Sequence, residues 1–274
     1  MANTVHLLCA GAAQGLVKAL EARFTADTGA VVQARFGAVG AMQEALRAGE
    51  PCDLLVLTAA MVTALAASGE VDASQCAALG RVRTGVAVRS GAALPDVSTP
   101  EALKALLLAS DGIYFPDPVR ATAGIHFAKV LRELGVHDEL ASRFRTFPNG
   151  ATSMRELAAC GEPRMVGCTQ VTEILYTPGV QLADLLPPQF ELATVYTAAV
   201  CTKAQQPARR HSPSRRCATS CPCRPVAAVT WSAAPSPSAG ARRWVRASWS
   251  RTSAAAAVPS PARPQPGLRP TATP

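Results

Sequence analysis

A strand–turn–helix unit occurs three times before residue 70, and this repetition constrains the fold more than any other feature of the chain. The apolar run 5–9 is followed by a Gly/Ala turn and by the amphipathic stretch 14–27, whose apolar residues recur at four-residue spacing. The same signals return at 30–47 and again at 53–67. Strands joined by helices in this way predict a parallel sheet that is covered on both faces.

The alternation of strands and helices continues beyond the third unit. Further strands are expected at 81–89, 112–115, 146–147, 165–168 and 191–201, and further helices at 99–109, 122–134, 153–160 and 171–175. Thr99 is the expected N-cap of its helix, with Pro100 at the first helical position. The sequence thus predicts an α/β fold of two lobes. The expected divisions are 1–80 for the first lobe, 81–180 for the second, and 181–206 for a return to the first.

The positive charge of the chain is confined to its end. Residues 207–274 hold 11 Arg and 12 of the 22 Pro, with no Lys, Asp or Glu, whereas residues 1–206 carry a net charge of −3. Frequent prolines and few apolar residues are typical of disorder. We expect a disordered basic Pro/Arg/Ala/Ser tail, and its use of Arg without Lys also fits a shifted reading frame near Pro207. The overall charge of +8 is therefore no sign of a nucleic-acid partner.

Cysteines and targeting signals narrow the class of protein. The chain has nine cysteines, an odd number without regular spacing, which argues against a disulfide framework. Cys9 and Cys168 end apolar runs and are expected in the core. The opening residues MANTVHLLCAG lack a basic region and a long apolar segment, so no secretory signal peptide is expected in the sequence as written. No apolar run approaches the roughly 18–20 residues that cross a bilayer.

The turns that open the helices suggest a site for anions. Such turns direct backbone N–H groups and the positive ends of helix dipoles toward one region, and helix starts near 121–124 and 150–153 add hydroxyl groups from the second lobe. Phosphate-binding and dinucleotide-binding glycine motifs are missing, and we expect no metal site, no cofactor and no catalytic residue. His126 is expected either to face the space between the two lobes or to lie on the surface of its helix. The expected ligand-binding residues are Ala12, Ala13, Gln14, Ala38, Val39, Gly40, Thr58, Thr122, Thr152, Ser153, Thr169 and Gln170.

Five segments carry a resemblance to a known family. They are Cys9–Ala12, Gln43–Leu54, Asp117–Pro118, Ala123–Ile125 and Gly167–Ile174. In these segments the chain resembles the periplasmic molybdate-binding protein and the related type 2 solute-binding proteins of ABC importers. The resemblance implies two lobes with a ligand cleft between them, which close on the ligand by a hinge motion.

The resemblance also implies a function. It points to a monomer that is not an enzyme, that binds a small anion and that partners the membrane component of an ABC importer. It implies a periplasmic location, although a cytoplasmic one stays open for the sequence as written. Ala12 and Ala13, and the turn Gly37–Gly40, stand where the molybdate binder has serines. Either an oxyanion or an organic carboxylate is therefore a candidate ligand. The alternatives are a cytoplasmic ligand sensor similar to LysR-type effector domains and an enzyme on the same fold.

Overall fold

The computed structural model describes residues 4–204. The prediction of a disordered tail at 207–274 lies outside the described residues. None of the helices in the described part is long and apolar enough to span a membrane.

Residues 4–67 form the three predicted units of strand and helix. The elements are β1 (Thr4–Ala10), the 3-10 turn η1 (Gly11–Ala13), α1 (Gln14–Thr28), β2 (Val31–Gly37), α2 (Val39–Arg47), β3 (Leu54–Thr58) and α3 (Ala59–Ala67). Each boundary lies within a few residues of its prediction, because glycines and a proline end the helices. Gly29, for example, has φ +70° and ends α1 in the left-handed conformation that glycine adopts without strain.

The remaining elements build the second lobe and the return to the first. They are β4 (Val71–Arg89), α4 (Pro100–Ala109), β5 (Gly112–Pro116), α5 (Thr122–Glu133), η2 (Ala141–Arg143), β6 (Phe144–Phe147), α6 (Gly150–Ala159), β7 (Met165–Gln170), α7 (Val171–Tyr176), β8 (Val180–Leu185), η3 (Pro188–Phe190) and β9 (Ala193–Cys201). The predicted strand at 81–89 is only the second half of β4, which begins at Val71.

The sheet is mixed rather than wholly parallel. Its strand order is β2-β1-β3-β9-β4-β7-β5-β6, with β8 paired to β4. The predicted parallel pairing holds for β1 with β2 and β3, and for β5 with β6 and β7. It is wrong for β4 and β9, which pair antiparallel with each other and with their neighbours. The difference arises because these two long strands carry the chain in opposite directions between the lobes.

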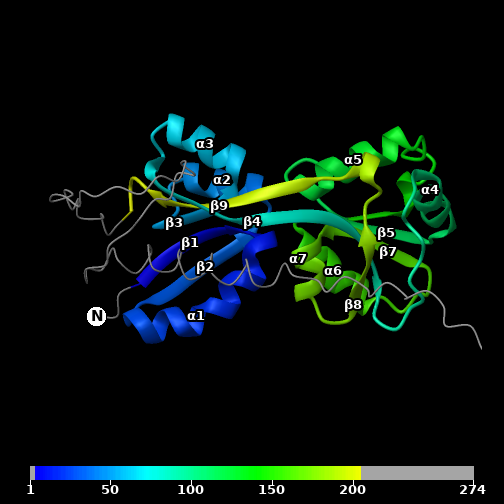
Figure 1. The fold of residues 1–274 in the computed structure, drawn as a ribbon, viewed down its shortest axis with the longest axis horizontal. Helices are drawn as coiled ribbons and strands as arrows, with labels where there is room; N and C mark the ends of the chain where they lie inside the picture. Colours follow the sequence, from blue (N-terminus) through cyan, green and yellow to red (C-terminus); the bar gives the residue numbers. More distant parts are fainter. Residues whose placement is uncertain (1–3, 205–274) are drawn as a thin grey trace, which may run out of the picture.

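β4 and β9 are the two strands that connect the lobes (Figure 1). The first half of β4 pairs with β9 in the first lobe, and its second half pairs with β7 and β8 in the second. The predicted return at residue 181 comes too early, because β8 pairs with the 85–89 part of β4 and Leu186 packs in the second lobe. The return is made by β9.

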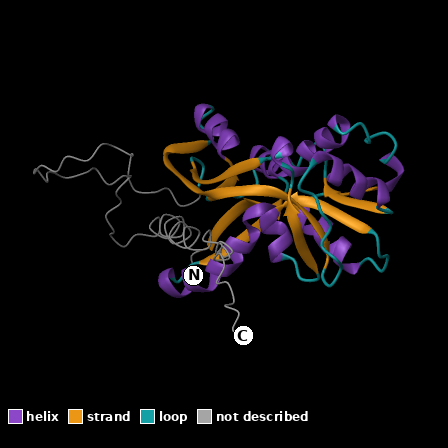
Figure 2. Ribbon diagram, turned by 45° about the vertical axis from the view of Figure 1, so that its right-hand side comes forward, coloured by secondary structure: helices purple, strands orange, loops and turns teal. Residues whose placement is uncertain are grey.

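Helices lie on both sides of the sheet (Figure 2). Four clusters of buried side chains fill the space between these helices and the sheet. Alternate residues of β3 divide between two of them: Leu55 and Leu57 pack with α2 and α3, whereas Leu54 and Val56 pack with α1. In the second lobe α4 and α5 cover one face, and α6 and α7 cover the other. Helices thus cover both faces of each lobe, as predicted. Cys9 and Cys168 are buried, which confirms their placement in the core.

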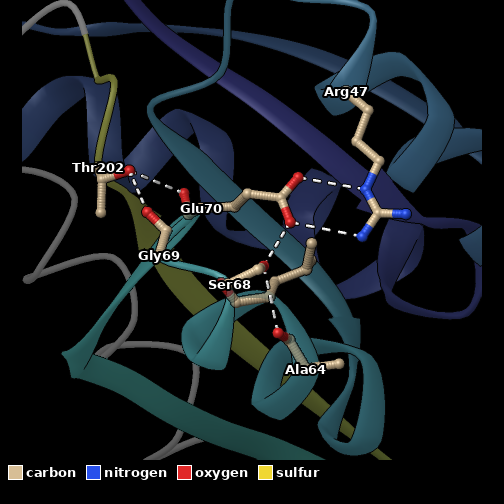
Figure 3. A network of polar contacts seen from close by, with 7 residues as sticks. Arg47, Ala64, Ser68, Gly69, Glu70 and Thr202 are labelled. Atoms are coloured by element: carbon tan, nitrogen blue, oxygen red, sulfur yellow. Dashed lines mark hydrogen bonds and ion pairs between the residues drawn. The ribbon is translucent and has the colours of Figure 1, made fainter.

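A polar network ties the end of β9 to the first lobe (Figure 3). The Glu70 carboxylate accepts hydrogen bonds from Arg47 Nε at 3.2 Å and from Ser68 Oγ at 2.5 Å. Thr202 Oγ1 donates to the carbonyl oxygens of Gly69 and Glu70 at 2.8 and 3.2 Å. These contacts join the last residue of α2 to the segments that follow α3 and β9.

The N-cap of α4 has the side-chain contact that the sequence predicts. Thr99 Oγ1 accepts a hydrogen bond from the Ala102 N–H at 3.1 Å. Replacing Thr99 with alanine leaves this N–H without its partner, so we expect the free energy of unfolding to fall by about 1 kcal/mol. Urea denaturation of the two proteins measures the difference, with Thr99→Ser as the control that retains the hydroxyl. Equal stability of wild type and Thr99→Ala would contradict the assignment.

Candidate ligand-binding site

A pocket lies where the two lobes meet. Its empty volume is about 270 Å³, including the solvent at its mouth. The lining comes from the ends of β1, β2, β5 and β7, the starts of α2, α5 and α6, and one side chain each from α7 and β9. The lining residues are Ala10, Gly11, Ala12, Gly37, Ala38, Val39, Pro116, Ala121, Thr122, Ala123, Asn149, Gly150, Gln170, Glu173 and Tyr196. Ligands of α/β proteins bind at such carboxyl ends of strands.

Helix starts from both lobes face this pocket without side-chain caps. Ala38 and Ala121 are the N-caps of α2 and α5, and neither supplies a side-chain hydrogen bond to its helix. The first N–H groups of an α-helix have no partner inside the helix, and they carry the positive end of its dipole. The pocket therefore offers backbone N–H groups from opposite lobes to an anionic ligand.

Direct contacts between the lobes surround the pocket. The Gly40 N–H donates to the Arg120 carbonyl oxygen at 3.2 Å, and Thr172 Oγ1 donates to the Ala12 carbonyl oxygen at 2.7 Å. Arg120 also forms an ion pair with Glu44, at 3.6 Å between Nη2 and Oε2. The two lobes thus touch each other directly around the pocket, and we call this the closed arrangement.

Glu173 is the charged side chain of the pocket lining. It belongs to α7, and Figure 1 shows this helix at the junction of the lobes. Only 5% of the residue is exposed. Its carboxylate accepts hydrogen bonds from Thr169 Oγ1 at 2.6 Å and from the backbone N–H groups of Gly150, Ala151 and Gln170. Burial raises the pKa of Glu173 to about 7, and these hydrogen bonds oppose the rise.

Two glycines allow the Glu173 carboxylate to sit between the lobes. A Cβ atom on Gly11, in the first lobe, would lie closer than 3.0 Å to Glu173 Oε1. A Cβ atom on Gly150, at the start of α6 in the second lobe, would lie closer than 3.0 Å to Oε2. Any side chain at either position would displace the carboxylate or the backbone around it.

Gln170 and Tyr196 complete the polar part of the lining. Gln170 is buried at the end of β7, and its Nε2 donates to Thr194 Oγ1 at 3.4 Å. Its Oε1 has no hydrogen-bond partner among the described residues. Burial is the main cause that raises the pKa of the Tyr196 phenol, and the nearby Glu173 adds to it. The described residues contain no group of three or more His, Cys, Asp or Glu that could hold a metal ion.

The family model for bacterial extracellular solute-binding proteins matches residues 5–211 of this chain. The chain belongs to this family. The family assignment confirms the resemblance to solute-binding proteins, and the end of the matched segment lies close to the change in composition at Pro207.

Two solved structures and one curated protein illustrate the range of this family's relatives. The periplasmic molybdate-binding protein of Azotobacter vinelandii is 16% identical, with a TM-score of 0.60 over 74% of this chain and 87% of that one. The substrate-binding domain assigned to a molybdenum ABC transporter of Clostridium difficile is 14% identical, with a TM-score of 0.52 over 74% and 86%. These two likenesses show the two-lobed fold. An aconitate isomerase from a Pseudomonas species is 26% identical over 211 residues, which are 75% of this chain and 78% of the relative.

The structure brings part of the predicted site together in this solute-binding protein. Five of the predicted residues line the pocket: Ala12, Ala38, Val39, Thr122 and Gln170. Seven do not: Ala13, Gln14, Gly40, Thr58, Thr152, Ser153 and Thr169. A direct role in ligand binding stays a prediction for the five that line the pocket.

The predicted residues outside the lining have other contacts. Thr58 caps α3 by accepting from the Met61 N–H at 3.4 Å. Thr169 donates to Glu173, and Gly40 joins the lobes as described above. Ser153 is fully buried in α6, with no partner for its hydroxyl among the described residues.

The other predicted residues outside the lining belong to helix starts. Ala13 is buried against α1, and Gln14 is the first residue of that helix. The Thr152 N–H donates to the Asn149 side chain at 2.9 Å, within the N-cap of α6. His126 is also outside the lining, and its Nε2 lies 2.8 Å from the Phe190 carbonyl oxygen.

Sequence reasoning missed the acidic group of the pocket. A glutamate on a short helix is normally exposed to solvent, so its sequence position does not indicate a role for Glu173 in a pocket. The signal was its place four residues after Thr169, in a segment that follows an apolar strand. Because the strand ends at Gln170 and the helix begins at once, the Thr169 hydroxyl contacts the Glu173 carboxylate, and Glu173 lines the pocket.

Proposed function

We propose that this solute-binding protein captures a small organic polycarboxylate in the pocket between its lobes. The observation that carries the proposal is the meeting of the uncapped starts of α2 and α5, from opposite lobes, at one pocket. Their N–H groups suit carboxylate oxygens, and an anion that contacts both lobes stabilises the closed arrangement.

The chemistry of the lining favours a carboxylate over a tetrahedral oxyanion. Ala12 and Ala38 contribute methyl groups where hydroxyls would help to hold an oxyanion, and Val39, Pro116 and Ala121 add apolar surface. A carbon skeleton contacts such surface favourably, whereas an inorganic oxyanion does not. The Pseudomonas relative is named for aconitate, a tricarboxylate, which makes the aconitates and citrate the first ligands to test.

The same proposal includes a partner and a location. The likeness to the substrate-binding domain of an ABC transporter supports delivery of the ligand to a membrane importer. The likeness to a periplasmic protein supports a periplasmic location for a monomeric receptor.

A second candidate function is an enzyme on the same pocket. Two observations favour it: the curated relative named as an isomerase, and Glu173, an ionisable group in the pocket whose pKa of about 7 suits proton transfer near neutral pH. Binding and catalysis are compatible, because an isomerase must also hold its substrate.

Thermal unfolding in the presence of candidate ligands tests the proposed function. We expect cis-aconitate, trans-aconitate or citrate to raise the melting temperature of the full chain by roughly 5–10 °C at about 100 times the dissociation constant, since binding then adds about 2.7 kcal/mol. Molybdate, tungstate and sulfate are expected to have smaller effects. Stabilisation by these oxyanions alone would contradict the choice of ligand class. A flat response to all six compounds would contradict the proposed function.

A further inference from the structure

The position of Glu173 is at odds with a pocket that only binds anions. The carboxylate lines the pocket and occupies the N–H groups of Gly150 and Ala151 at the start of α6, which would otherwise be free for the ligand. A negative charge at this place also repels an anionic ligand. A receptor gains nothing from these two effects, so the carboxylate needs another explanation.

Proton transfer explains the arrangement. The contacts of Glu173 with Thr169 and the start of α6 fix the carboxylate at the pocket wall, and its pKa of about 7 leaves both protonation states populated near neutral pH. The titratable groups that influence one another here are Glu173, Tyr196 on β9 and Cys9 on β1. Burial raises the pKa values of the Tyr196 phenol and the Cys9 thiol, so both stay protonated when Glu173 titrates.

We propose that Glu173 is a catalytic acid–base residue that moves a proton between two carbon atoms of an unsaturated polycarboxylate bound in the pocket. The inference rests on the proposed binding of a polycarboxylate, and it adds a reaction to it. Glu173 is one of the residues that line the pocket, which places it beside a molecule bound there.

The reaction needs no partner other than the substrate. The Glu173 carboxylate removes a proton from the methylene carbon that lies between a carboxylate and a C=C bond. The electron pair of the broken C–H bond forms a new C=C bond to the middle carbon. The pair of the old C=C bond moves to the far carbon, which takes a proton back from Glu173. The double bond moves by one carbon, and no atom or electron is gained or lost.

The rest of the pocket suits this step. Negative charge spreads over the substrate's carboxylates while the proton is on Glu173, and the N–H groups at the starts of α2 and α5 face the pocket to stabilise it. The Gln170 amide, whose Oε1 has no partner among the described residues, supplies a further polar contact.

Proton NMR in D2O tests the inference with cis-aconitate and trans-aconitate as probes. We expect the wild-type chain to interconvert them and to place deuterium on the methylene carbon, at a rate that rises with pH to a plateau with a midpoint near 7. The rate measured for Glu173→Gln is expected to be at least about 100-fold lower than that of the wild type. Glu173→Asp keeps a carboxylate and is expected to retain the pH profile at a lower rate.

Matched controls separate catalysis from folding and from binding. Glu156→Gln changes an exposed carboxylate on α6 and is expected to leave the rate unchanged. Binding of the probes without deuterium exchange overturns this inference and leaves the proposed function standing. Absence of binding overturns both. Exchange at the wild-type rate in Glu173→Gln also overturns the assignment, and melting temperatures show that each variant is folded.

Discussion

Replacing Gly124 with alanine is expected to lower the free energy of unfolding by about 3 kcal/mol. Gly124 lies in the first turn of α5, and a Cβ atom there would lie closer than 3.0 Å to the carbonyl oxygens of Pro116 and Asp117. These are backbone atoms at the end of β5, and they cannot rotate away as a side-chain tip can. The overlap must therefore distort the strand, the helix or both.

Hydrogen bonds hold that strand end in place. The Asp117 N–H donates to the Phe147 carbonyl oxygen at 2.7 Å, and the Asp117 carbonyl oxygen accepts from the Ala121 N–H at 3.1 Å. Asp117 Oδ1 also accepts from the N–H groups of Val119 and Arg120. The connection from β5 to α5 is thus fixed at several points, so it cannot yield to an added methyl group.

Urea denaturation of the full chain measures the effect of the substitution. Gly161→Ala is the matched control, because no heavy atom lies within 4 Å of the Cβ position at Gly161. The control is expected to change the free energy of unfolding by no more than about 0.5 kcal/mol. Equal urea midpoints for Gly124→Ala and Gly161→Ala would contradict the close contact between α5 and the end of β5.

Glu173 is expected to make the chain less stable as the pH rises. Its pKa in the folded chain is about 7, above the ordinary value of 4.5, so the folded chain holds a proton that the unfolded chain has released. Stability from this group is therefore fully present below about pH 4.5 and is lost as the pH rises through 7. The separation of the two pKa values corresponds to about 3 kcal/mol at high pH.

The comparison with Glu173→Gln isolates this effect. The difference in the free energy of unfolding between the variant and the wild type should grow in favour of the variant by about 2 kcal/mol from pH 5.5 to pH 8.5, because the rest of the change falls below pH 5.5. Hydrogen bonds lower the pKa values of Glu70, Asp96 and Asp111, so these carboxylates stay ionised over this range. A difference that does not change with pH would mean that Glu173 is already ionised at pH 5.5.

The regular elements were predictable because local patterns determine them. The helix of residues 14–28 follows from its four-residue apolar spacing, and its end follows from Gly29. The first half of β4 was not predictable, because the run 71–80 is rich in small and polar residues and is a strand only by pairing with β9. β8 was missed because it is short and lies between Pro178-Gly179 and Pro187-Pro188.

The region of the site could be predicted from the sequence, but many of its residues could not. Gly/Ala turns at helix starts indicated the region, and Ala12, Ala38 and Thr122 line the pocket. The side chains that give the pocket its chemistry depend on how the second lobe and β9 are placed against the first. Glu173 and Tyr196 are therefore visible only in three dimensions, because no local pattern relates them to the turn at Ala12.

Isothermal titration of the full chain with trans-aconitate and citrate tests the central claim most directly. We predict one binding site per chain and an affinity at least about 10-fold weaker in Gln170→Ala. We predict no change in Gln181→Ala, because Gln181 is not among the lining residues and its side chain donates to the Ala92 carbonyl oxygen. Absence of binding to wild type, or equal affinities for wild type and Gln170→Ala, would contradict a polycarboxylate site in the pocket between the lobes.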